Sequence, residues 1–372
     1  MFEMPRFAPA LLTLLLLALL PASAHAARGM EFALWDDDVF LDQAWMDRET
    51  ALDHAVELRA KRIRVNLLWS RLLVHGAEAR REPEGGPVYD FSRVDALLAA
   101  AADRGIKLQL TITGPAPAWA TANRKVGNHR PDARKFAAFA RTAAEHFKGR
   151  VDRYSIWNEP NWHTWLYPAK SAARIYRQLY RAGYAAVKDV DPGAQVLFGE
   201  LAPIGGSRAT PPLEFLRDVT CSNVRYKRAR KCKPLKADGV ALHPYQFQHA
   251  PQIAAGRPDD TPIGALSRMT RALDKLSARG ALVRPDKRRM DLYLTEFGYL
   301  TVGKRAQKPR VRAKWLHDAF HIARRNPRVR QLLQYQLVDP PEDRVWHTAI
   351  LSRSGRPLAT YANLAKASAA NR

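Results

Sequence analysis

The sequence lacks several patterns, and each absence excludes a class of protein. The 372-residue chain has no H-E-x-x-H motif, the helical ligand pair of zinc peptidases, and no G-x-G-x-x-G turn of the kind that binds dinucleotide phosphates. It also has no low-complexity linker that would divide it into separate domains. We therefore expect a single domain that works without a metal ion or a bound cofactor.

Long apolar runs are missing beyond the N-terminal region. Arg6 precedes the apolar stretch Leu11–Leu20, and Ala24-His25-Ala26 follows it as a small-x-small cleavage site. The stretch is short for a membrane span, and a membrane anchor is the alternative interpretation. The pattern predicts a signal peptide over residues 1–26 and an exported domain over residues 27–372 without a transmembrane segment.

Cysteine is scarce, since the chain contains only Cys221 and Cys232. Export to an oxidising compartment favours a disulfide between them, and two free thiols are the alternative. Two cysteines without paired histidines nearby provide too few ligands for a structural zinc site.

Acidic residues are few. The chain has 36 Asp and Glu against 60 Lys and Arg, which gives a net charge of +24. Such a charge favours contact with an anionic cell-wall polymer, although a generally basic, solvated surface is the simpler interpretation. The basic runs are not interleaved with stacking aromatic residues, so we expect no specific nucleic acid partner. The densest basic clusters are Arg225–Lys231, Arg284–Arg289, Arg324–Arg330 and Lys304–Arg310.

Apolar, strand-like runs alternate with amphipathic, helix-like runs along the whole chain. The helix-like runs include Asp42–Lys61 and Pro212–Thr220. Strands that are apolar throughout, each followed by a helix, are typical of a closed (β/α)8 TIM barrel in the α/β class. An open doubly wound sheet is the alternative, but it normally carries a glycine-rich phosphate turn. The eight predicted strands are Met30–Trp35, Arg62–Trp69, Ile106–Thr113, Val151–Asn158, Ala194–Glu200, Asp238–Tyr245, Met290–Phe297 and Gln331–Val338.

Two glutamates at strand ends, Glu159 and Glu296, lie in distinctive local motifs. Glu159 comes after the fourth strand, where Pro160 prevents the strand from continuing. Glu296 ends the seventh strand, with Gly298 as the breaker. Because active sites of such barrels lie at the carboxyl ends of the strands, we expect both carboxyl groups on one face. Two carboxyl groups facing a glycosidic bond are what a retaining glycosidase needs, as acid/base and as nucleophile.

Other polar residues near strand ends suit the same chemistry. Asn158 precedes Glu159 and is placed to hydrogen-bond a sugar hydroxyl. His243 and Tyr245 end the sixth strand, and a phenol there can bond the nucleophile. Arg64 lies in the second strand, where a fixed cation would keep the nucleophile ionised, although a purely structural ion pair is the alternative. Glu200 also ends a strand, and we interpret it as a supporting or structural residue.

Aromatic residues near the predicted strand ends are candidates for contact with sugar rings. For any one tryptophan, packing beneath the loops is an equal alternative. The candidates are Trp35, Trp69, Trp119, Trp162, Tyr335 and Trp346.

The motif Trp157-Asn158-Glu159-Pro160-Asn161 resembles the acid/base signature of clan A glycoside hydrolases, which include cellulases, β-xylosidases and arabinofuranosidases. Leu294-Thr295-Glu296-Phe297-Gly298 resembles their nucleophile strand, and His243-Pro244-Tyr245 resembles their sixth-strand motif. Arg64 falls where these enzymes place a buried arginine. The resemblance implies a (β/α)8 barrel, a retaining mechanism, an oligo- or polysaccharide with β-linkages as substrate, and Glu159 and Glu296 as the catalytic pair.

One departure from the family pattern leaves the sugar and the linkage open. These families carry a tryptophan at the end of the eighth strand, but that strand reads Leu332-Leu333-Gln334-Tyr335-Gln336 here. Tyr335, Gln336 or Trp346 are the possible substitutes. A non-catalytic glycan-binding or cell-wall-binding protein on the same barrel is the competing hypothesis, and it would normally have lost one of the two glutamates. We expect the protein to be a monomer.

Overall fold

The computed structural model describes residues 29–254 and 256–369, and the predicted signal peptide therefore lies outside the described residues. Eight parallel strands close into a barrel, and each pairs with its neighbours in the order β1-β2-β3-β4-β5-β7-β9-β10. The predicted TIM barrel is thus confirmed. The barrel strands are β1 (Glu31–Trp35), β2 (Arg62–Leu68), β3 (Lys107–Thr113), β4 (Arg153–Ile156), β5 (Gln195–Leu201), β7 (Gly239–Leu242), β9 (Leu292–Leu294) and β10 (Val329–Tyr335).

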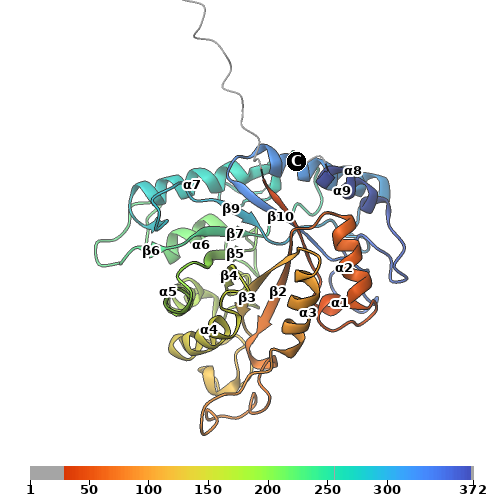
Figure 1. The fold of residues 1–372 in the computed structure, drawn as a ribbon. Helices are drawn as coiled ribbons and strands as arrows, with labels where there is room; N and C mark the ends of the chain where they lie inside the picture. The colour runs from red at the N-terminus through yellow and green to blue at the C-terminus, as the bar shows by residue number, and fades with distance from the viewer. Residues whose placement is uncertain (1–28, 255, 370–372) are drawn as a thin grey trace, which may run out of the picture.

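Helices surround the barrel on the outside, as Figure 1 shows. They are α1 (Asp37–Phe40), α2 (Arg48–Glu57), α3 (Ser92–Ala102), α4 (Ala133–Phe147), α5 (Ala172–Val190), α6 (Pro212–Val219), α7 (Leu266–Ala278), α8 (Pro309–Arg325) and α9 (Ala359–Ala369). Among the described residues, no helix combines the length and the apolar character needed to cross a membrane.

The predicted helix over 42–61 is too long at both ends. Helix α2 begins only at Arg48, because Asp47 caps it and accepts a hydrogen bond of 2.9 Å from the backbone N–H of Thr50. Two very short strands, β6 (Leu235–Lys236) and β8 (Leu282–Val283), were not predicted. They pair with each other outside the barrel, before the strands β7 and β9 begin.

The hydrophobic core lies between the barrel and the helices. In β2, Ile63, Val65 and Leu67 belong to this core. The alternating residues Arg62 and Arg64 are also buried; Arg62 contacts the neighbouring strand β3, and Arg64 reaches Glu296. Successive side chains of a strand point to opposite faces, so the interior of the barrel contains these polar side chains together with a few apolar ones.

The Cys221–Cys232 disulfide is present, as predicted. It joins the end of α6 to the segment before β7, and therefore lies at the amino-terminal end of the barrel, away from the two glutamates. The basic cluster Arg225–Lys231 lies within the loop that this disulfide closes.

Candidate active site

Glu159 lies in a tight turn that begins where β4 ends. The turn has φ angles of 68° at Trp157 and 39° at Glu159, in the left-handed region that non-glycine residues seldom adopt. The backbone N–H of Glu159 donates to the carbonyl oxygen of Glu200 at 3.0 Å, and the indole N–H of Trp157 donates to the carbonyl of Trp165 at 2.6 Å. Backbone strain of this kind persists where surrounding contacts hold it, commonly at functional sites.

Glu296 follows β9 and is only 6% exposed. The hydroxyl of Tyr245 donates to its Oε1 at 2.9 Å, and Nη1 of Arg64 donates to its Oε2 at 3.2 Å. Burial and the charge of Glu296 hold the pKa of Tyr245 well above its ordinary value, so the phenol keeps the proton that it donates. Both contacts favour a carboxylate at Glu296 with a fixed orientation.

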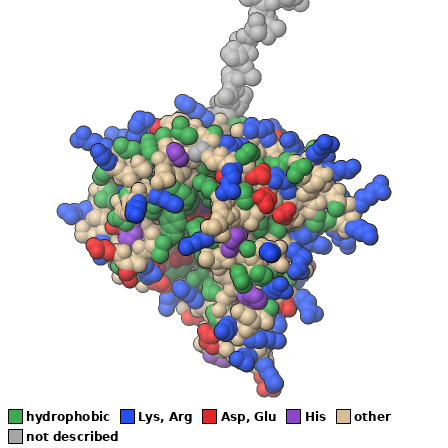
Figure 2. Space-filling view, turned by 180° about the vertical axis from the view of Figure 1, so that it is seen from behind, with side chains coloured by type: hydrophobic (Ala, Val, Ile, Leu, Met, Phe, Trp, Pro, Cys, Tyr) green, Lys and Arg blue, Asp and Glu red, His purple; other side chains and the backbone are tan. Residues whose placement is uncertain are grey.

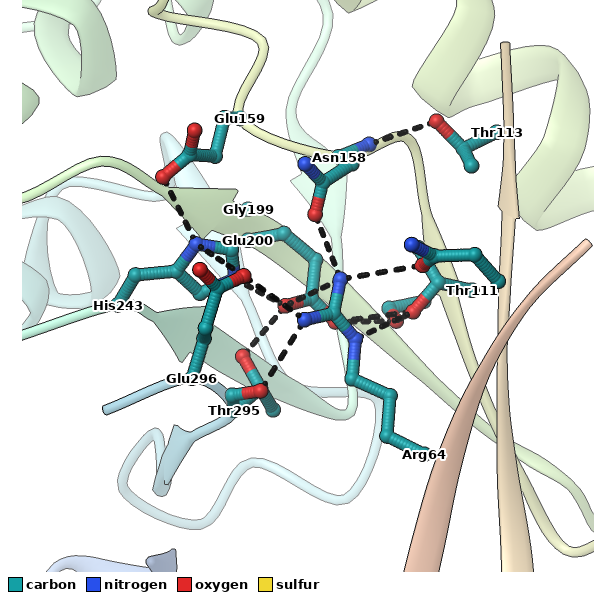
Figure 3. A network of polar contacts seen from close by, with 12 residues as sticks. Arg64, Thr111, Thr113, Asn158, Glu159, Gly199, Glu200, His243, Thr295 and Glu296 are labelled. Atoms are coloured by element: carbon teal, nitrogen blue, oxygen red, sulfur yellow. Dashed lines mark hydrogen bonds and ion pairs between the residues drawn. The ribbon is translucent and has the colours of Figure 1, made fainter. Parts of the chain in front are cut away.

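The two glutamates lie close together, beside His243 (Figure 3). One oxygen of Glu159, one oxygen of Glu296 and one nitrogen of His243 all lie within 4.8 Å of one another. Retaining glycosidases separate their two carboxyl groups by about 5–5.5 Å, and inverting enzymes by about 6.5–9.5 Å. With one oxygen of each group within 4.8 Å of the other, the pair is closer than in inverting enzymes and compatible with the shorter separation of retaining enzymes.

His243 joins three carboxyl groups. Its Nδ1 lies 2.9 Å from Oε1 of Glu159 and 3.3 Å from Oε2 of Glu296, and its Nε2 lies 2.8 Å from Oε2 of Glu200. Burial alone would lower the pKa of His243, but the three carboxylates outweigh burial and raise it from 6.5 to about 9. The ring is therefore an imidazolium at neutral pH, with both nitrogens donating.

Glu200 is fully buried beneath this ring. It also accepts hydrogen bonds from the hydroxyls of Ser155 and Thr295. Burial opposes ionisation of Glu200, but Arg64, His243 and the hydroxyl donors outweigh it and lower its pKa from 4.5 to about 2. The structure thus places Glu200 in a supporting position, where it contacts His243 rather than the open cleft.

Arg64 fixes the orientation of Asn158 from inside the barrel. Its Nη2 donates to Oδ1 of Asn158 at 2.6 Å, and its Nε donates to the hydroxyl of Thr111 at 3.0 Å. Figure 3 shows the guanidinium between Asn158 and Thr295. With its oxygen bonded to Arg64, Asn158 has its amide NH₂ left to offer a substrate.

The charges of the site balance when Glu159 is protonated. Arg64 and His243 carry two positive charges, and Glu200 and Glu296 carry two negative charges. Burial and the nearby charge of Glu296 raise the pKa of Glu159 above 4.5, although the hydrogen bond from His243 opposes them. The direction of this shift favours the protonated form of Glu159, which is the form that a general acid needs.

The triad of Glu159, His243 and Glu296 has spacing that would admit a metal ion. A histidine binds a metal only as the neutral ring with one nitrogen free. Both ring nitrogens of His243 already face carboxylates, and the ring is protonated at neutral pH. The donor set therefore suits proton transfer better than metal binding.

The predicted aromatic residues separate into two groups, and four of them lie at the site. Trp35 stacks on Tyr335 with 4.3 Å between ring centroids, and the guanidinium of Arg64 lies 4.2 Å from the Trp35 ring. Trp346 stacks on Tyr245 at 5.4 Å. Tyr335 thus places an aromatic ring at the end of β10, where the family pattern has tryptophan.

The other group consists of Trp69 and Trp119, which lie in the hydrophobic core. The structure therefore does not support the prediction that these two residues contact the substrate. Trp69 is fully buried, stacks on Phe139 of α4 at 5.6 Å and meets Trp119 edge-on at 5.7 Å. Trp119 is 2% exposed. Neither offers a free ring face to a sugar, because neighbouring side chains already cover them.

A cleft of about 740 Å³ opens beside Glu159 and Tyr245. Trp346 lines it together with Trp162, the fourth of the predicted aromatic residues that lie at the site. The indole N–H of Trp162 has no hydrogen-bond partner within the described part of the chain. The cleft is formed by the loops that follow β4, β5, β7, β9 and β10.

No protein-family model matches the sequence, and no curated protein matches it. The solved structures that resemble the chain include a family 39 glycoside hydrolase from Bacteroides cellulosilyticus WH2, at 17% identity with a TM-score of 0.64, covering 92% of this chain and 64% of that one. A monomeric β-xylosidase from Caulobacter crescentus CB15 is 18% identical with a TM-score of 0.60, over 91% and 67% of the two chains. Endoglucanase Cel5A from Thermotoga maritima is 14% identical with a TM-score of 0.57, over 92% and 97%.

This chain has the barrel fold of those glycoside hydrolases. It spans under two thirds of the Bacteroides protein but nearly all of the Thermotoga endoglucanase. The fold implied by the motif resemblance is therefore confirmed, with Glu159 and Glu296 after barrel strands four and seven of eight.

Proposed function

We propose that the protein is an exported retaining glycoside hydrolase that cleaves a β-linked glycan by double displacement. The observation that carries the proposal is the spacing of Glu159 and Glu296, whose nearest ligand oxygens lie within 4.8 Å. The environments of the two carboxyl groups also differ, since burial raises the pKa of Glu159, whereas Glu296 accepts hydrogen bonds from Tyr245 and Arg64. Two carboxyl groups held in opposite protonation states can act as acid and nucleophile.

In the first step, a carboxylate oxygen of Glu296 forms a bond to the anomeric carbon. The bond from that carbon to the glycosidic oxygen breaks, and the oxygen takes the proton of Glu159 as the leaving group departs. Arg64 and Tyr245 aim the Glu296 carboxylate, while Asn158 offers its amide N–H to the hydroxyl next to the reacting carbon.

In the second step, Glu159 acts as a base. It removes a proton from a water molecule, the water oxygen bonds to the anomeric carbon, and the ester bond to Glu296 breaks. Two inversions give net retention. His243 donates from Nδ1 toward Glu159 throughout, so it stabilises the charge on Glu159 in the interval between the two proton transfers.

Trp35 and Tyr335 are the proposed contacts for the sugar that reacts, because they adjoin Arg64 beside Glu296. Trp162 and Trp346 are the proposed contacts on the side of Glu159, together with Tyr245. A non-catalytic glycan-binding protein would need none of the proton arrangement described above.

Export is supported by the predicted signal peptide and by the Cys221–Cys232 disulfide. Contact with an anionic cell-wall polymer is proposed for the disulfide-closed loop alone. Its exposed residues Arg225, Lys227, Arg230 and Lys231 have no ion pair within the described residues.

By contrast, aspartate side chains neutralise most of the positive charge in the cluster 284–289 and at residues 328 and 330. Arg288 pairs with Asp286 at 2.8 Å, and Asp274 pairs with both Arg289 at 2.6 Å and Arg328 at 2.8 Å. Lys and Arg side chains are spread over the whole face seen in Figure 2, so pairing rather than number distinguishes the clusters.

Covalent trapping tests the catalytic proposal. In a 2-deoxy-2-fluoro β-glycoside with a dinitrophenyl leaving group, the fluorine slows both steps, but the good leaving group keeps the first step fast enough for the glycosyl–enzyme ester to accumulate. Peptide mapping of the labelled protein should locate the sugar on Glu296. A label on any other residue would contradict the assignment.

A further inference from the structure

The cleft beside Glu159 carries an unusual charge distribution for a sugar site. Its lining includes two arginines, Arg208 from the loop after β5 and Arg305 from the loop after β9. Both side chains belong to exposed residues, and neither takes part in a salt bridge within residues 29–254 and 256–369. The one carboxyl group in the lining is Glu159, the proposed acid.

The basic cluster Lys304–Arg310 follows Glu296 in the sequence, and the structure shows which of its residues line the cleft. Of the cluster Lys304–Arg310, Arg305 lines the cleft, while Lys308 and Arg310 lie at the beginning of α8. Arg208 was not predicted, because it lies outside any basic run. The guanidinium of Arg305 lies 5.6 Å from the ring of Phe247, which gives it a defined place on the wall.

The position of the cleft relative to Glu159 and Glu296 indicates which part of a substrate the cleft would bind. It reaches the site at Glu159, the proposed acid that protonates the glycosidic oxygen, and Glu296 is not part of its lining. The portion of the substrate beyond the glycosidic oxygen is the leaving group. The cleft therefore accommodates the leaving-group portion of the glycan.

Aromatic and cationic groups meet in this cleft. Trp346 stacks on Phe247 at 5.8 Å, so it presents a flat platform on the same wall as Arg305. Flat rings bind the faces of sugars, while a guanidinium binds carboxylate or sulfate oxygens with two parallel N–H donors. A neutral glycan would use the platform and leave both arginines without partners.

We propose that the leaving-group side of the cleft recognises an anionic substituent on the glycan, a carboxylate or a sulfate ester, through Arg208 and Arg305. This inference rests on the proposed hydrolase activity where it is tested by kinetics, but a binding measurement can test it without that activity. It specifies the class of substrate as an acidic glycan.

The test uses aryl β-glycosides that share a sugar and differ only in the leaving group. For glucose, xylose, mannose, galactose and arabinofuranose, 4-carboxyphenyl and 4-sulfophenyl glycosides are compared with the neutral 4-carbamoylphenyl glycoside. The wild-type protein should favour an anionic leaving group by about tenfold in kcat/KM. The binding free energy of one charge-assisted hydrogen-bonded pair corresponds to about a tenfold ratio. The carboxylate arm and the sulfonate arm, in which the sulfonate stands in for a sulfate ester, distinguish the two kinds of anion.

The double variant Arg208→Ala/Arg305→Ala should reduce this ratio to about one. The ratio is measured within a single protein, so partial loss of folded material does not affect it. The matched control is Arg288→Ala at the opposite end of the barrel, where the ratio should persist. An equal kcat/KM for charged and neutral leaving groups in the wild-type protein, or a ratio that survives in the double variant, would overturn the inference.

Binding separates this inference from the proposed hydrolysis. Isothermal titration of the same glycosides into Glu296→Ala should give about tenfold tighter binding of the anionic compounds. Charge-selective binding without turnover in the wild-type protein would contradict the hydrolase and keep the cleft assignment. Turnover with no charge selectivity in either assay would keep the hydrolase and contradict the cleft assignment.

Discussion

His243 and Glu200 form a buried ion pair, with 2.8 Å between Nε2 and Oε2, directly beneath the two proposed catalytic carboxyl groups. Neither side chain has any exposed surface. Breaking such a pair by removing one charge leaves the other uncompensated and costs several kcal/mol. The pair therefore links the stability of the barrel to the protonation state of its active site.

The variant Glu200→Gln should show this link as a pH-dependent loss of stability. The pKa of His243 is raised to about 9, so its contribution is complete below 6.5 and is lost as the pH rises through about 9. The pKa of Glu200 is lowered to about 2, so its contribution is complete above 4.5 and is lost as the pH falls toward about 2.

The difference in melting temperature between the wild type and Glu200→Gln should thus be largest from pH 4.5 to 6.5 and should decline on both sides. Burial raises the pKa of Asp36 to about 8, but Asp36 is present in both proteins and cancels in the difference. A constant difference from pH 3 to pH 9 would show that the pair carries no such linkage.

Glu296→Ala should abolish turnover, because no other carboxylate can reach the anomeric carbon in its place. Azide should restore turnover by occupying the vacated space, since it is a small anionic nucleophile. The product should be a glycosyl azide, which NMR identifies. Full activity of this variant without azide would refute the assignment of the nucleophile.

Glu159→Ala should discriminate between substrates by their leaving groups. A phenol that leaves easily needs no proton, so its kcat/KM should stay within about a factor of ten to one hundred of wild type, whereas an alkyl glycoside should lose about 10³-fold or more. The decline of activity at high pH should also disappear, because the raised pKa of Glu159 is its proposed cause. Equal losses for both kinds of leaving group would exclude Glu159 as the acid.

Cys221→Ser should lower stability without slowing catalysis. The disulfide joins residues 11 apart in sequence, and a loop of that size contributes about 2–3 kcal/mol in the chain-entropy model. The melting temperature should fall while kcat stays near that of wild type, because the bridge lies at the end of the barrel away from Glu159. Two free thiols by mass analysis of the exported protein would show that the bridge is not formed.

Neutralising the disulfide-closed loop should weaken retention on an anionic cell-wall polymer. The variant Arg230→Gln/Lys231→Gln and its control Arg288→Gln/Arg289→Gln each remove two positive charges. Only the loop variant removes charges without a partner, so only it should elute several-fold earlier at low salt. Equal elution of the two variants would mean that net charge alone governs binding.

The barrel was predictable because every barrel strand is buried and alternates with a helix. The fourth, sixth and seventh predicted strands were too long at their carboxyl ends. Strands β4, β7 and β9 end just before Trp157, His243 and Thr295, where the chain turns into the loops of the site. The strands β6 and β8 escaped prediction because two residues each carry no periodic pattern.

The proposed catalytic pair was recognised from local motifs, whereas the side chains that contact the pair were harder to recognise from the sequence. The pairing of Glu200 with His243 joins β5 to the end of β7, and no local pattern encodes a contact between distant strands. Polar residues at alternate positions of β3, such as Gln109 and Thr111, were a signal for a polar barrel interior. Trp69 was misassigned because its burial depends on Phe139 from another helix.

The configuration of the first product tests the central claim most directly. Wild-type protein is mixed with the best substrate from a panel of aryl β-glycosides, and proton NMR follows the anomeric signals before mutarotation equilibrates them. The spacing of Glu159 and Glu296 predicts that the β-anomer forms first. Initial formation of the α-anomer would mean direct attack by water and would contradict the double displacement.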